Sequence, residues 1–257
     1  MTVIACQLDI VWEDKPANHA KVTRLLEKAA PPAGSLVVLP EMFATGFSMR
    51  AAQITDSVTQ ETQRFLADTA QQFGVFLLAG VVTSGQSGLG RNECIGYNPA
   101  GEEIVRYCKI HPFTYGGESQ HYEAGTEVVL FDWAGFKVAP FICYDLRFPE
   151  IFRAAVKRGA NLFTVMANWP VTRIAHWNAL LPARAIENQA YVVGVNRCGD
   201  DPGLRYSGQS QIISPQGESL CNAGTAETTI QTDLNLQDLD LYRTALPFLA
   251  DQKYSVL

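Results

Sequence analysis

Three reactive side chains lie just after predicted strands in this sequence. Glu41 follows Pro40 at the end of the apolar run 36–39, and Lys109 lies where a strand gives way to a long loop. Cys143 closes a third apolar run and precedes a turn and a helix. Folds that mix strands and helices usually build their sites at such strand ends, so these side chains are candidates for one site.

A cysteine, a glutamate and a lysine together can attack an electrophilic carbon. The reactive form of cysteine is the thiolate, and a free thiol has a pKa of about 8.5. Activation therefore requires a base or a positive environment, and Glu41, Lys109 and a nearby helix start supply both. The lysine would also face the oxyanion that forms when the thiol attacks a carbonyl or nitrile carbon. The backbone N–H after Cys143 is a candidate for the second oxyanion donor.

Each of these residues also has a purely structural interpretation. Taken alone, Glu41 caps a turn, Lys109 is a solvated loop charge and Cys143 is a small core side chain. The context of the cysteine favours chemistry, because an inert core cysteine rarely ends a strand among charged residues. The charged residues that follow it are Asp145, Arg147 and Glu150.

The composition is that of an ordinary globular enzyme or binding protein. The chain has 257 residues, of which 47% are hydrophobic and 18% charged, with a net charge of -6. A mildly acidic chain without basic runs argues against nonspecific binding to nucleic acid or to anionic membranes. The N-terminus lacks the features of a secretory signal, and the apolar runs are too short to span a bilayer.

The cysteines indicate a reducing compartment and no metal. All six stand singly along the chain, without a Cys-x-x-Cys pair or a Cys/His cluster at zinc spacing. Dispersed cysteines in a chain without an export signal predict reduced thiols in the cytoplasm. The cysteine spacing therefore predicts no zinc site.

The first part of the chain alternates strands and helices. The predicted elements are strands at 2–8, 36–39 and 75–82, and helices at 18–29 and 59–73. The middle changes to hairpins, with strand pairs 94–97 with 103–107 and 128–131 with 136–142, and 84–90 is expected to be a loop. Later elements are helices at 149–158 and 173–188, strands at 162–167, 191–196, 206–213, 218–220 and 228–234, and a polar tail.

Helices in both parts, hairpins between them and the lack of a linker predict a single domain over 1–257. The pattern indicates α/β architecture with two packed sheets and helices outside, in preference to a doubly wound parallel sheet.

Taken together, the three reactive segments resemble the nitrilase superfamily of carbon–nitrogen hydrolases. Its members carry a Glu–Lys–Cys triad in motifs like LPEMF at 39–43, CKIHPF at 108–113 and ICYDLRFPE at 142–150. Three motifs in the family's order are far more specific than one. The resemblance covers nearly the whole chain and includes segments 167–188, 196–201 and 206–218. It implies a four-layer αββα sandwich with two mixed sheets, helices outside and pairing of two copies into a homodimer.

The resemblance also implies roles for particular residues. Glu41 becomes the general base, Lys109 the cation on the oxyanion side and Cys143 the nucleophile. Members often have a second glutamate after the lysine, and Glu118 matches it better than Glu123. That residue would orient the lysine, and the reaction that the resemblance implies needs no metal and no organic cofactor.

The motif details look most like the omega-amidase-like branch, whose substrates are monoamides of short dicarboxylates and of their 2-oxo analogues. The substrate carboxylate needs a cationic or hydroxyl partner, and Arg173 is the leading candidate. The other predicted substrate-binding residues are Tyr115, Trp169, His176 and Tyr144. A structural role for Arg173 as a helix-start charge is equally compatible with the sequence.

Two kinds of alternative remain open from the sequence. The same triad serves hydrolysis of nitriles, N-carbamoyl amines or deaminated peptide amides, and the pocket loops decide between these substrates. A non-catalytic binding or thiol-redox protein on the same scaffold is the alternative of another class.

Overall fold

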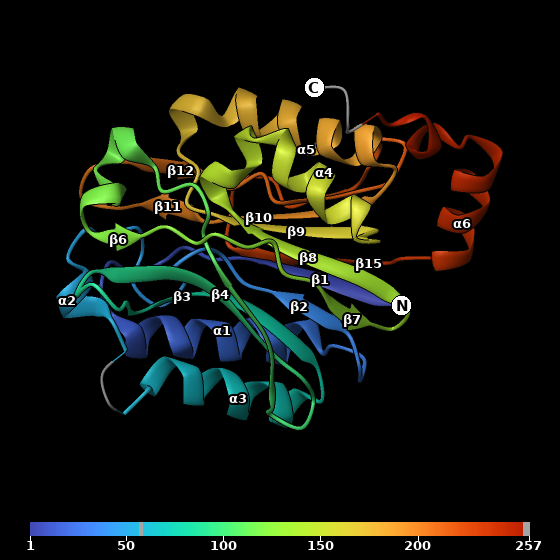
Figure 1. The fold of residues 1–257 in the computed structure, drawn as a ribbon. Helices are drawn as coiled ribbons and strands as arrows, with labels where there is room; N and C mark the ends of the chain where they lie inside the picture. The colour runs from blue at the N-terminus through green and yellow to red at the C-terminus, as the bar shows by residue number, and fades with distance from the viewer. Residues whose placement is uncertain (57–58, 254–257) are drawn as a thin grey trace.

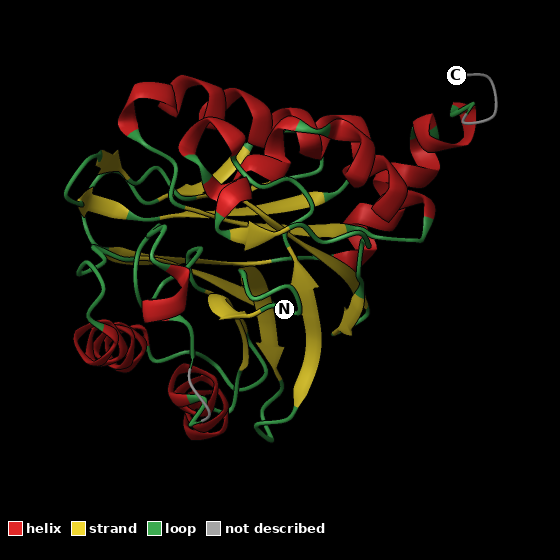
Figure 2. Ribbon diagram, turned by 60° about the vertical axis from the view of Figure 1, so that its left-hand side comes forward, coloured by secondary structure: helices red, strands yellow, loops and turns green. Residues whose placement is uncertain are grey.

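The computed structural model describes residues 1–56 and 59–253. Two β-sheets pack face to face and helices cover their outer faces, as Figures 1 and 2 show. Helices α1 and α3 lie on one side and α4 and α5 on the other (Figure 1). This arrangement confirms the predicted four-layer αββα sandwich.

The first sheet carries the N-terminal strands and mixes parallel with antiparallel pairs. Strands β1, β2 and β3 run parallel, whereas β15, β4 and β5 join antiparallel to their neighbours. In spatial order the strands are β15 (Thr228–Asp233), β1 (Thr2–Gln7), β2 (Leu36–Val38), β3 (Phe76–Ser84), β4 (Gly90–Tyr97) and β5 (Glu103–Cys108), and β6 (Tyr122–Glu123) pairs with β4.

The second sheet is also mixed, with a parallel centre and antiparallel edges. In spatial order its strands are β14 (Ser219–Asn222), β13 (Gln211–Ile213), β10 (Tyr191–Asn196), β9 (Leu162–Ala167), β8 (Phe136–Ile142) and β7 (Phe131–Trp133). A separate short hairpin consists of β11 (Cys198–Asp200) and β12 (Arg205–Ser207).

The α-helices are α1 (Lys15–Ala29), α2 (Ala51–Ile54), α3 (Glu61–Phe73), α4 (Pro149–Lys157), α5 (Ile174–Asn188) and α6 (Leu236–Ala245). The 3-10 turns are η1 (Thr114–Gly116), η2 (Glu118–Gln120), η3 (Cys143–Arg147), η4 (Val171–Arg173) and η5 (Phe248–Asp251). Helix α1 begins three residues before the predicted Asn18. The Asp14 side chain accepts a hydrogen bond from Ala17 N–H, and a proline is tolerated in the first turn.

The main core lies between the two sheets. Strand β1 shows how it forms, because successive side chains of a strand point to opposite faces. Val3 and Ala5 pack in the cluster shared with the second sheet, whereas Ile4 and Cys6 pack with side chains of α1. Between the sheets, β1 contacts β10 and β4 contacts β8. This packing brings the ends of strands from both sheets to one place.

The predicted hairpin over 128–142 was wrong in its first strand and its turn. Strand β7 starts only at Phe131, and Trp133 pairs with Phe136 across a two-residue turn. Ala134 and Gly135 both have positive φ, 49° and 87°, which matches a type I′ turn. A turn of this type suits the twist of the strands, so the short connection replaces the expected turn at 132–135.

The predicted strand 206–213 was also wrong, because the chain changes sheets within it. Tyr206 lies in β12, whereas β13 begins at Gln211 in the second sheet. Gly208 and Gln209 lie between them with positive φ, 64° and 62°. The polar tail expected after 234 contains α6, whose cap Asn235 accepts from two backbone N–H groups. Helix α6 projects beyond the sandwich in Figure 1.

All six cysteines are free, in agreement with the reduced thiols that the sequence predicts. In the two described stretches of the chain, we find no helix with the length and apolar character needed to cross a membrane.

Gly80 of β3 lies against the backbone that follows β2. A Cβ atom at Gly80 would lie 2.4 Å from Glu41 Cα and 2.6 Å from Met42 N. We therefore expect Gly80→Ala to lower the free energy of unfolding by about 1–3 kcal/mol, because the backbone at 41–42 must move. Denaturant titration measures this change.

The matched control is Gly203→Ala, whose Cβ would meet only Asp201 Oδ1 at 3.9 Å. Its stability should stay near that of the wild type. Equal stability of both variants would contradict the close approach.

Candidate active site

Glu41 is fully buried at the mouth of β2. Its backbone is held against β3, where Gly80 N–H donates to Pro40 O at 3.1 Å and Phe43 N–H donates to Gly80 O at 3.1 Å. Met42 has a φ of 45°, a left-handed conformation that is uncommon for a side chain of its size. The turn thus directs the Glu41 carboxylate into the space between the sheets.

Lys109 follows β5 directly and is also buried. Its Nζ lies 2.9 Å from Glu41 Oε1 and 2.8 Å from Glu118 Oε2, so the ammonium group bridges two carboxylates. Nζ also lies 5.4 Å from the centroid of the Phe47 ring. Lys109 is therefore not a solvated loop charge, which was its structural interpretation from the sequence.

Glu118 is the second glutamate of the site. It begins η2 with a fully buried side chain, and its Oε2 accepts from Phe113 N–H at 2.5 Å. Glu123 instead binds Arg91 Nε at 2.9 Å. The structure therefore brings Glu118 and not Glu123 to Lys109.

Cys143 occupies a sharp elbow between β8 and η3. Its φ is 47°, in the left-handed region that favours glycine. Sγ lies 4.0 Å from Asn168 O, and the same asparagine donates its backbone N–H to the Glu41 carboxylate. The Tyr144 N–H follows in the first turn of η3, where N–H groups have no acceptor within the helix. The four predicted residues Glu41, Lys109, Glu118 and Cys143 thus form one cluster.

The charges of this cluster depend on one another. Burial works to lower the pKa of Lys109, but the carboxylates of Glu118 and Glu41 outweigh it and raise that pKa above its ordinary value. Burial works to raise the pKa of Glu41, yet the ammonium group and hydrogen bonds from Lys109 lower it. Both groups are therefore charged at neutral pH.

The thiol has the opposite tendency. Burial raises the pKa of Cys143 well above its ordinary value of 9.0, and the Glu41 carboxylate raises it further against the effect of Lys109. With two carboxylates and one ammonium group around it, the resting sulfur is a neutral thiol. A base must remove its proton as it attacks, and Glu41 is in contact with it.

Two asparagines hold the Glu41 carboxylate and were missed from the sequence. Asn92 Nδ2 donates to both Glu41 Oε1 and Glu118 Oε1, each at 2.8 Å. Asn168 donates its backbone N–H to Glu41 Oε2 at 2.8 Å and its Nδ2 to Glu41 O at 2.7 Å. Asn92 had no visible signal, because the predicted strand began at Cys94 while β4 begins at Gly90.

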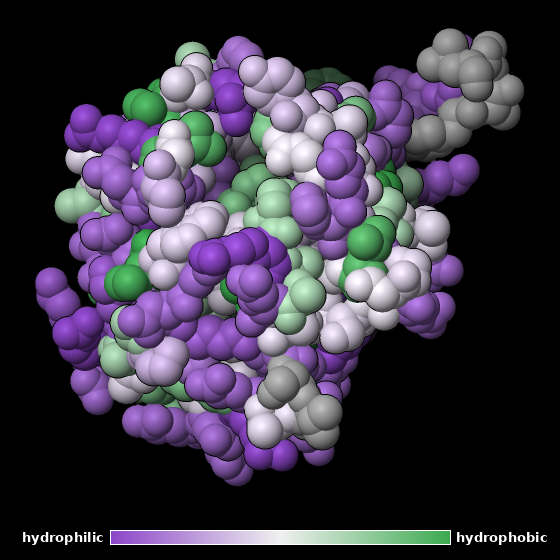
Figure 3. Space-filling view, turned by 90° about the vertical axis from the view of Figure 1, so that its left-hand side faces the viewer, coloured by the Kyte–Doolittle hydropathy of each residue, from purple (hydrophilic) through white to green (hydrophobic). Residues whose placement is uncertain are grey.

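A pocket with about 390 Å³ of empty space opens beside Cys143. Its apolar walls are Phe47, Phe113, Tyr144, Trp169, Pro170 and Leu204, and its polar lining residues are Asn168, Arg147 and Arg173. None of the described residues that line it is acidic. In Figure 3, which faces the end of the molecule where η1, η2 and β6 lie, pale and green residues gather amid hydrophilic ones.

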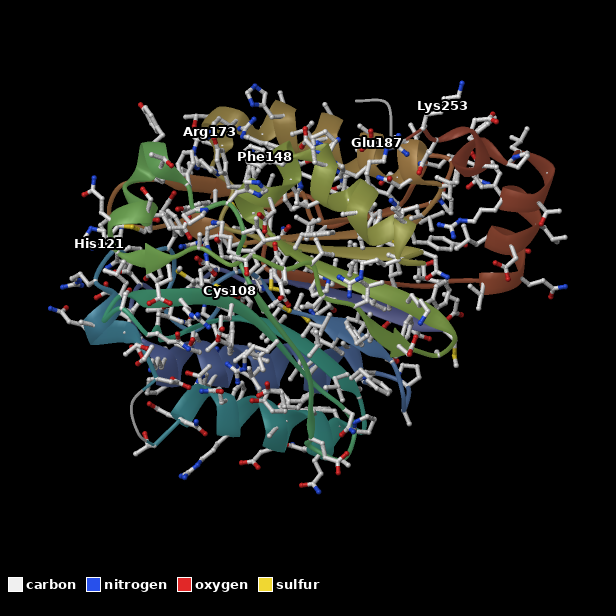
Figure 4. All side chains as sticks on the ribbon, viewed as in Figure 1. Cys108, His121, Phe148, Arg173, Glu187 and Lys253 are labelled. Carbon is white, nitrogen blue, oxygen red and sulfur yellow. The ribbon has the colours of Figure 1, made fainter. Side chains whose placement is uncertain are left out.

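Two arginine side chains, Arg147 and Arg173, line the pocket. Arg173 lies over the Phe113 ring at 5.3 Å, and Arg147 lies over the Trp169 ring at 4.7 Å. Within the described chain neither guanidinium has a carboxylate partner. Figure 4 shows Arg173 at one end of the helical layer, next to the start of α5. The position of Arg147 in the pocket lining was missed, because the sequence indicated only a charge near the cysteine.

The other predicted substrate-binding residues differ in their placement. Tyr144 and Trp169 line the pocket, and the Trp169 indole donates to Arg173 O at 2.8 Å. His176 lies behind the lining, with Nδ1 3.2 Å from both terminal nitrogens of Arg147. Tyr115 is 90% exposed and contacts Phe113 rather than the pocket. The spacing of residues in the sequence did not reveal that the side chains of Tyr115 and His176 lie outside the pocket lining.

The arrangement can perform nucleophilic substitution at a carbonyl carbon inside a largely apolar pocket. It combines a thiol, a carboxylate in contact with it and a fixed cation. Among the residues that the structure describes, no group of three or more His, Cys, Asp or Glu side chains is placed to hold a metal ion.

Comparisons with known proteins agree with this chemistry. The model of the carbon–nitrogen hydrolase family matches residues 2–244. Omega-amidase YafV from Escherichia coli strain K12 is 38% identical over 254 residues, covering 98% of this chain and 96% of the relative. A 2-oxoglutaramate amidase from Bacillus subtilis strain 168 is 34% identical over 251 residues. The match covers 97% of this chain and 96% of the relative.

A solved structure is similar over the whole chain. It is a CN-hydrolase superfamily protein from Xanthomonas campestris with an arsenic adduct in its active site. The two structures agree with a TM-score of 0.94 at 31% identity, covering 100% of this chain and 98% of the other.

The raised thiol pKa has a spectroscopic consequence. We expect no thiolate absorbance from Cys143 at neutral pH, measured as the ultraviolet difference between the wild type and Cys143→Ser. Glu41→Gln removes the carboxylate charge that raises this pKa and leaves Lys109 in place. The thiolate should therefore appear at lower pH in Glu41→Gln than in the wild type.

Cys221→Ser serves as the control, because Cys221 is partly exposed and lies in β14. A thiolate signal from Cys143 at neutral pH, or an unchanged titration in Glu41→Gln, would show that the charge balance is wrong.

Proposed function

Because the chain belongs to the carbon–nitrogen hydrolase family, we propose that Cys143 hydrolyses the amide of a small carboxylate, with Glu41 as base and Lys109 as oxyanion partner. The observation that carries this proposal is the lysine held by two buried glutamates, together with Asn168, whose carbonyl oxygen lies by the Cys143 thiol and whose N–H groups bind Glu41. The protein is an amide-hydrolysing enzyme, similar to omega-amidases along almost its full length.

The first half-reaction forms a thioester. Cys143 Sγ attacks the amide carbon while Glu41 takes the thiol proton, so a carbon–sulfur bond forms and the carbonyl oxygen becomes an oxyanion. Lys109 and the Tyr144 N–H stabilise that oxygen. The carbon–nitrogen bond then breaks, and ammonia leaves with the proton from Glu41.

The second half-reaction releases the acid. Glu41, again ionised, takes a proton from a water that attacks the thioester carbon. The carbon–sulfur bond breaks, and the proton on Glu41 returns to the sulfur. The free acid and the neutral thiol are restored, and no other reactant is needed.

The charge of the cluster explains why this order is favourable. When Glu41 accepts the proton, one negative charge moves from its carboxylate to the substrate oxygen. The total charge near Lys109 is unchanged, so the buried cation is never left without a nearby anion. Glu118 and Asn92 keep the ammonium group in place through both half-reactions.

The pocket supports a substrate that bears a carboxylate. Arg173 and Arg147 present two guanidinium groups without acidic partners in the described chain, and arginine binds carboxylates in a bidentate manner. We assign Arg173 and Arg147 to the substrate carboxylate, and Trp169 and Tyr144 to the apolar walls. A short dicarboxylate monoamide or its 2-oxo analogue places the amide at Cys143 and the acid at the arginines.

We also propose that the chain is a single domain that acts in the cytoplasm as a homodimer. The proposal for pairing is supported by exposed apolar side chains on α5 and near the C-terminus, namely Ile186, Leu241 and Phe248, with exposed fractions of 51%, 61% and 55%. Light scattering after gel filtration measures the mass of the assembly. A monomer at micromolar concentration would contradict the pairing.

The substrate assignment is tested by ammonia release from a panel of compounds. We expect activity on monoamides of short dicarboxylates and of their 2-oxo analogues, and little on nitriles or N-carbamoyl amines. Cys143→Ala should lower kcat by about 10⁴-fold or more, because the nucleophile is lost. Cys221→Ala is the control and should keep wild-type activity. Activity on carbamoyl compounds alone would overturn the substrate choice, and an active Cys143→Ala would overturn the mechanism.

The two arginines are tested with paired substrates. Arg173→Met and Arg147→Met should each raise KM for a carboxylate-bearing amide by about 10- to 100-fold, the loss of one charged hydrogen-bonding partner. KM for a neutral amide of the same length should stay nearly constant. The matched control is Arg153→Met. Arg153 lies on α4 and pairs with Glu187 of α5. Equal losses on both substrates would mean that the arginines do not bind the carboxylate.

A further inference from the structure

A second buried carboxylate, Asp145, lies beside the proposed site and is not used in the reaction above. Its side chain is fully buried and accepts four hydrogen bonds. Ile142 N–H and Tyr107 Oη–H donate to Oδ2 at 3.0 and 2.7 Å, and the His111 N–H donates to Oδ1 at 3.0 Å. The fourth contact is His111 Nδ1, 2.9 Å from Oδ1.

One side of this carboxylate holds the elbow that carries Cys143. Asp145 Oδ2 binds the N–H of Ile142, the residue just before the cysteine, so the side chain closes a ring around Cys143 and Tyr144. Cys143 is left-handed, with a φ of 47°. Such a conformation persists only where neighbouring contacts hold it. The hydrogen bond from Ile142 N–H to the Asp145 carboxylate spans Cys143 and stabilises this conformation.

The other side holds the segment that carries Lys109. Tyr107 lies two residues before the lysine and His111 two residues after it, and both donate to the same carboxylate. Lys109 itself makes its hydrogen bonds to Glu41 and Glu118. Asp145 therefore joins the Tyr107 hydroxyl and the His111 backbone, on the two sides of Lys109, to the backbone before Cys143.

Aromatic contacts keep the donors of this group in place. The His111 ring stacks on Phe148 with centroids 3.8 Å apart and an interplanar angle of 9°. Tyr107 meets Phe141 edge to face at 5.8 Å. Phe148 directly precedes α4, and Figure 4 shows it at the helical layer that covers the second sheet. Rings fixed in this way direct their donors at Asp145 without help from solvent.

We propose that Asp145, together with Tyr107 and His111, is the positioning group that sets the placement of the Cys143 thiol relative to the Lys109 ammonium. The proposal rests on the proposed function, because it assigns the thiol and the lysine to one reaction. Attack and oxyanion stabilisation both depend on that placement, and a displacement of about 1 Å can lower a rate by about 100-fold. Binding of the substrate carboxylate at the arginines does not depend on it.

An aspartate is specifically suited to this position. Both of its oxygens accept, and each oxygen meets two donors. In Asp145→Asn one oxygen becomes an NH₂ group, which is unable to accept from a backbone N–H. Either the bond across the elbow or the bonds to His111 must then be lost. Tyr107→Phe removes only one donor and keeps the ring contact with Phe141.

The experiment compares four variants by steady-state kinetics. Asp145→Asn should lower kcat by about 100-fold. Tyr107→Phe should lower kcat by about tenfold. His111→Leu should lower kcat, whereas His111→Asn, which keeps a side-chain N–H close to the backbone, should restore most of it. KM should change by less than about threefold in each variant, because substrate binding does not depend on this group.

The matched control is Tyr191→Phe, which removes a buried hydroxyl that donates to Asn235 O at 3.2 Å, away from the site. It should leave kcat unchanged. Folded fraction is followed by thermal unfolding, so that a loss of kcat is compared only among folded variants. A role in stability alone predicts that kcat per folded molecule is constant, and that outcome would overturn the proposal.

A second measurement separates this proposal from the proposed function. Alkylation of Cys143 by a neutral reagent, followed by mass spectrometry, reports the placement of the thiol near Glu41 without any substrate. We expect slower alkylation in Asp145→Asn and His111→Leu, with recovery in His111→Asn. Wild-type rates in all variants would overturn the positioning role. Failure of the wild type to hydrolyse any amide, with these alkylation differences intact, would overturn only the proposed function.

Discussion

The structure depends on the placement of one ammonium group, Lys109, between two buried carboxylates. Moving each such ion out of water costs several kcal/mol, so none of the three is stable there without the others. Their positions come from separate parts of the first sheet and its loops: the end of β2 supplies Glu41, the end of β5 supplies Lys109 and η2 supplies Glu118. The face-to-face packing of the sheets then presents this group to Cys143 at the end of β8.

Burial first, and then the excess of one negative charge in this group, raise the pKa of the Cys143 thiol. A thiol beside a lone cation is ionised at rest, whereas here burial and Glu41 keep Cys143 neutral. In the proposed reaction the proton is removed only as an electrophilic carbon approaches, which suits an amide substrate and protects the thiol between turnovers. Left-handed backbone at Met42 and Cys143, on the two sides of the contact, shows that strain is concentrated at the same place.

The sequence predicted much of the fold because local periodicity is strong in strands and helices buried on a defined face. Its errors lie where the turn or the third dimension decides. The residues 131–136 form a tight turn because two residues with positive φ match the strand twist, and composition alone suggested a longer one. The stretch 206–213 has uniform strand character, yet it crosses from one pair of strands to another sheet at Gly208. Helix α6 buries only Leu239 among its side chains, so its sequence shows little helical periodicity of apolar residues.

The order of residues along the chain was enough to predict reactive side chains at strand ends, and its motifs indicated a family. Which polar groups contact those side chains depends on how the strands and sheets pack. Asn92 and Asn168 reach Glu41 because the first sheet aligns β4 with β3 and the packing of the two sheets brings the end of β9 to Glu41. Arg147 enters the pocket and Tyr115 does not, because side-chain direction depends on the turns of η3 and η1. Contacts between residues distant in the chain are set by sheet packing, and neither spacing nor composition records them.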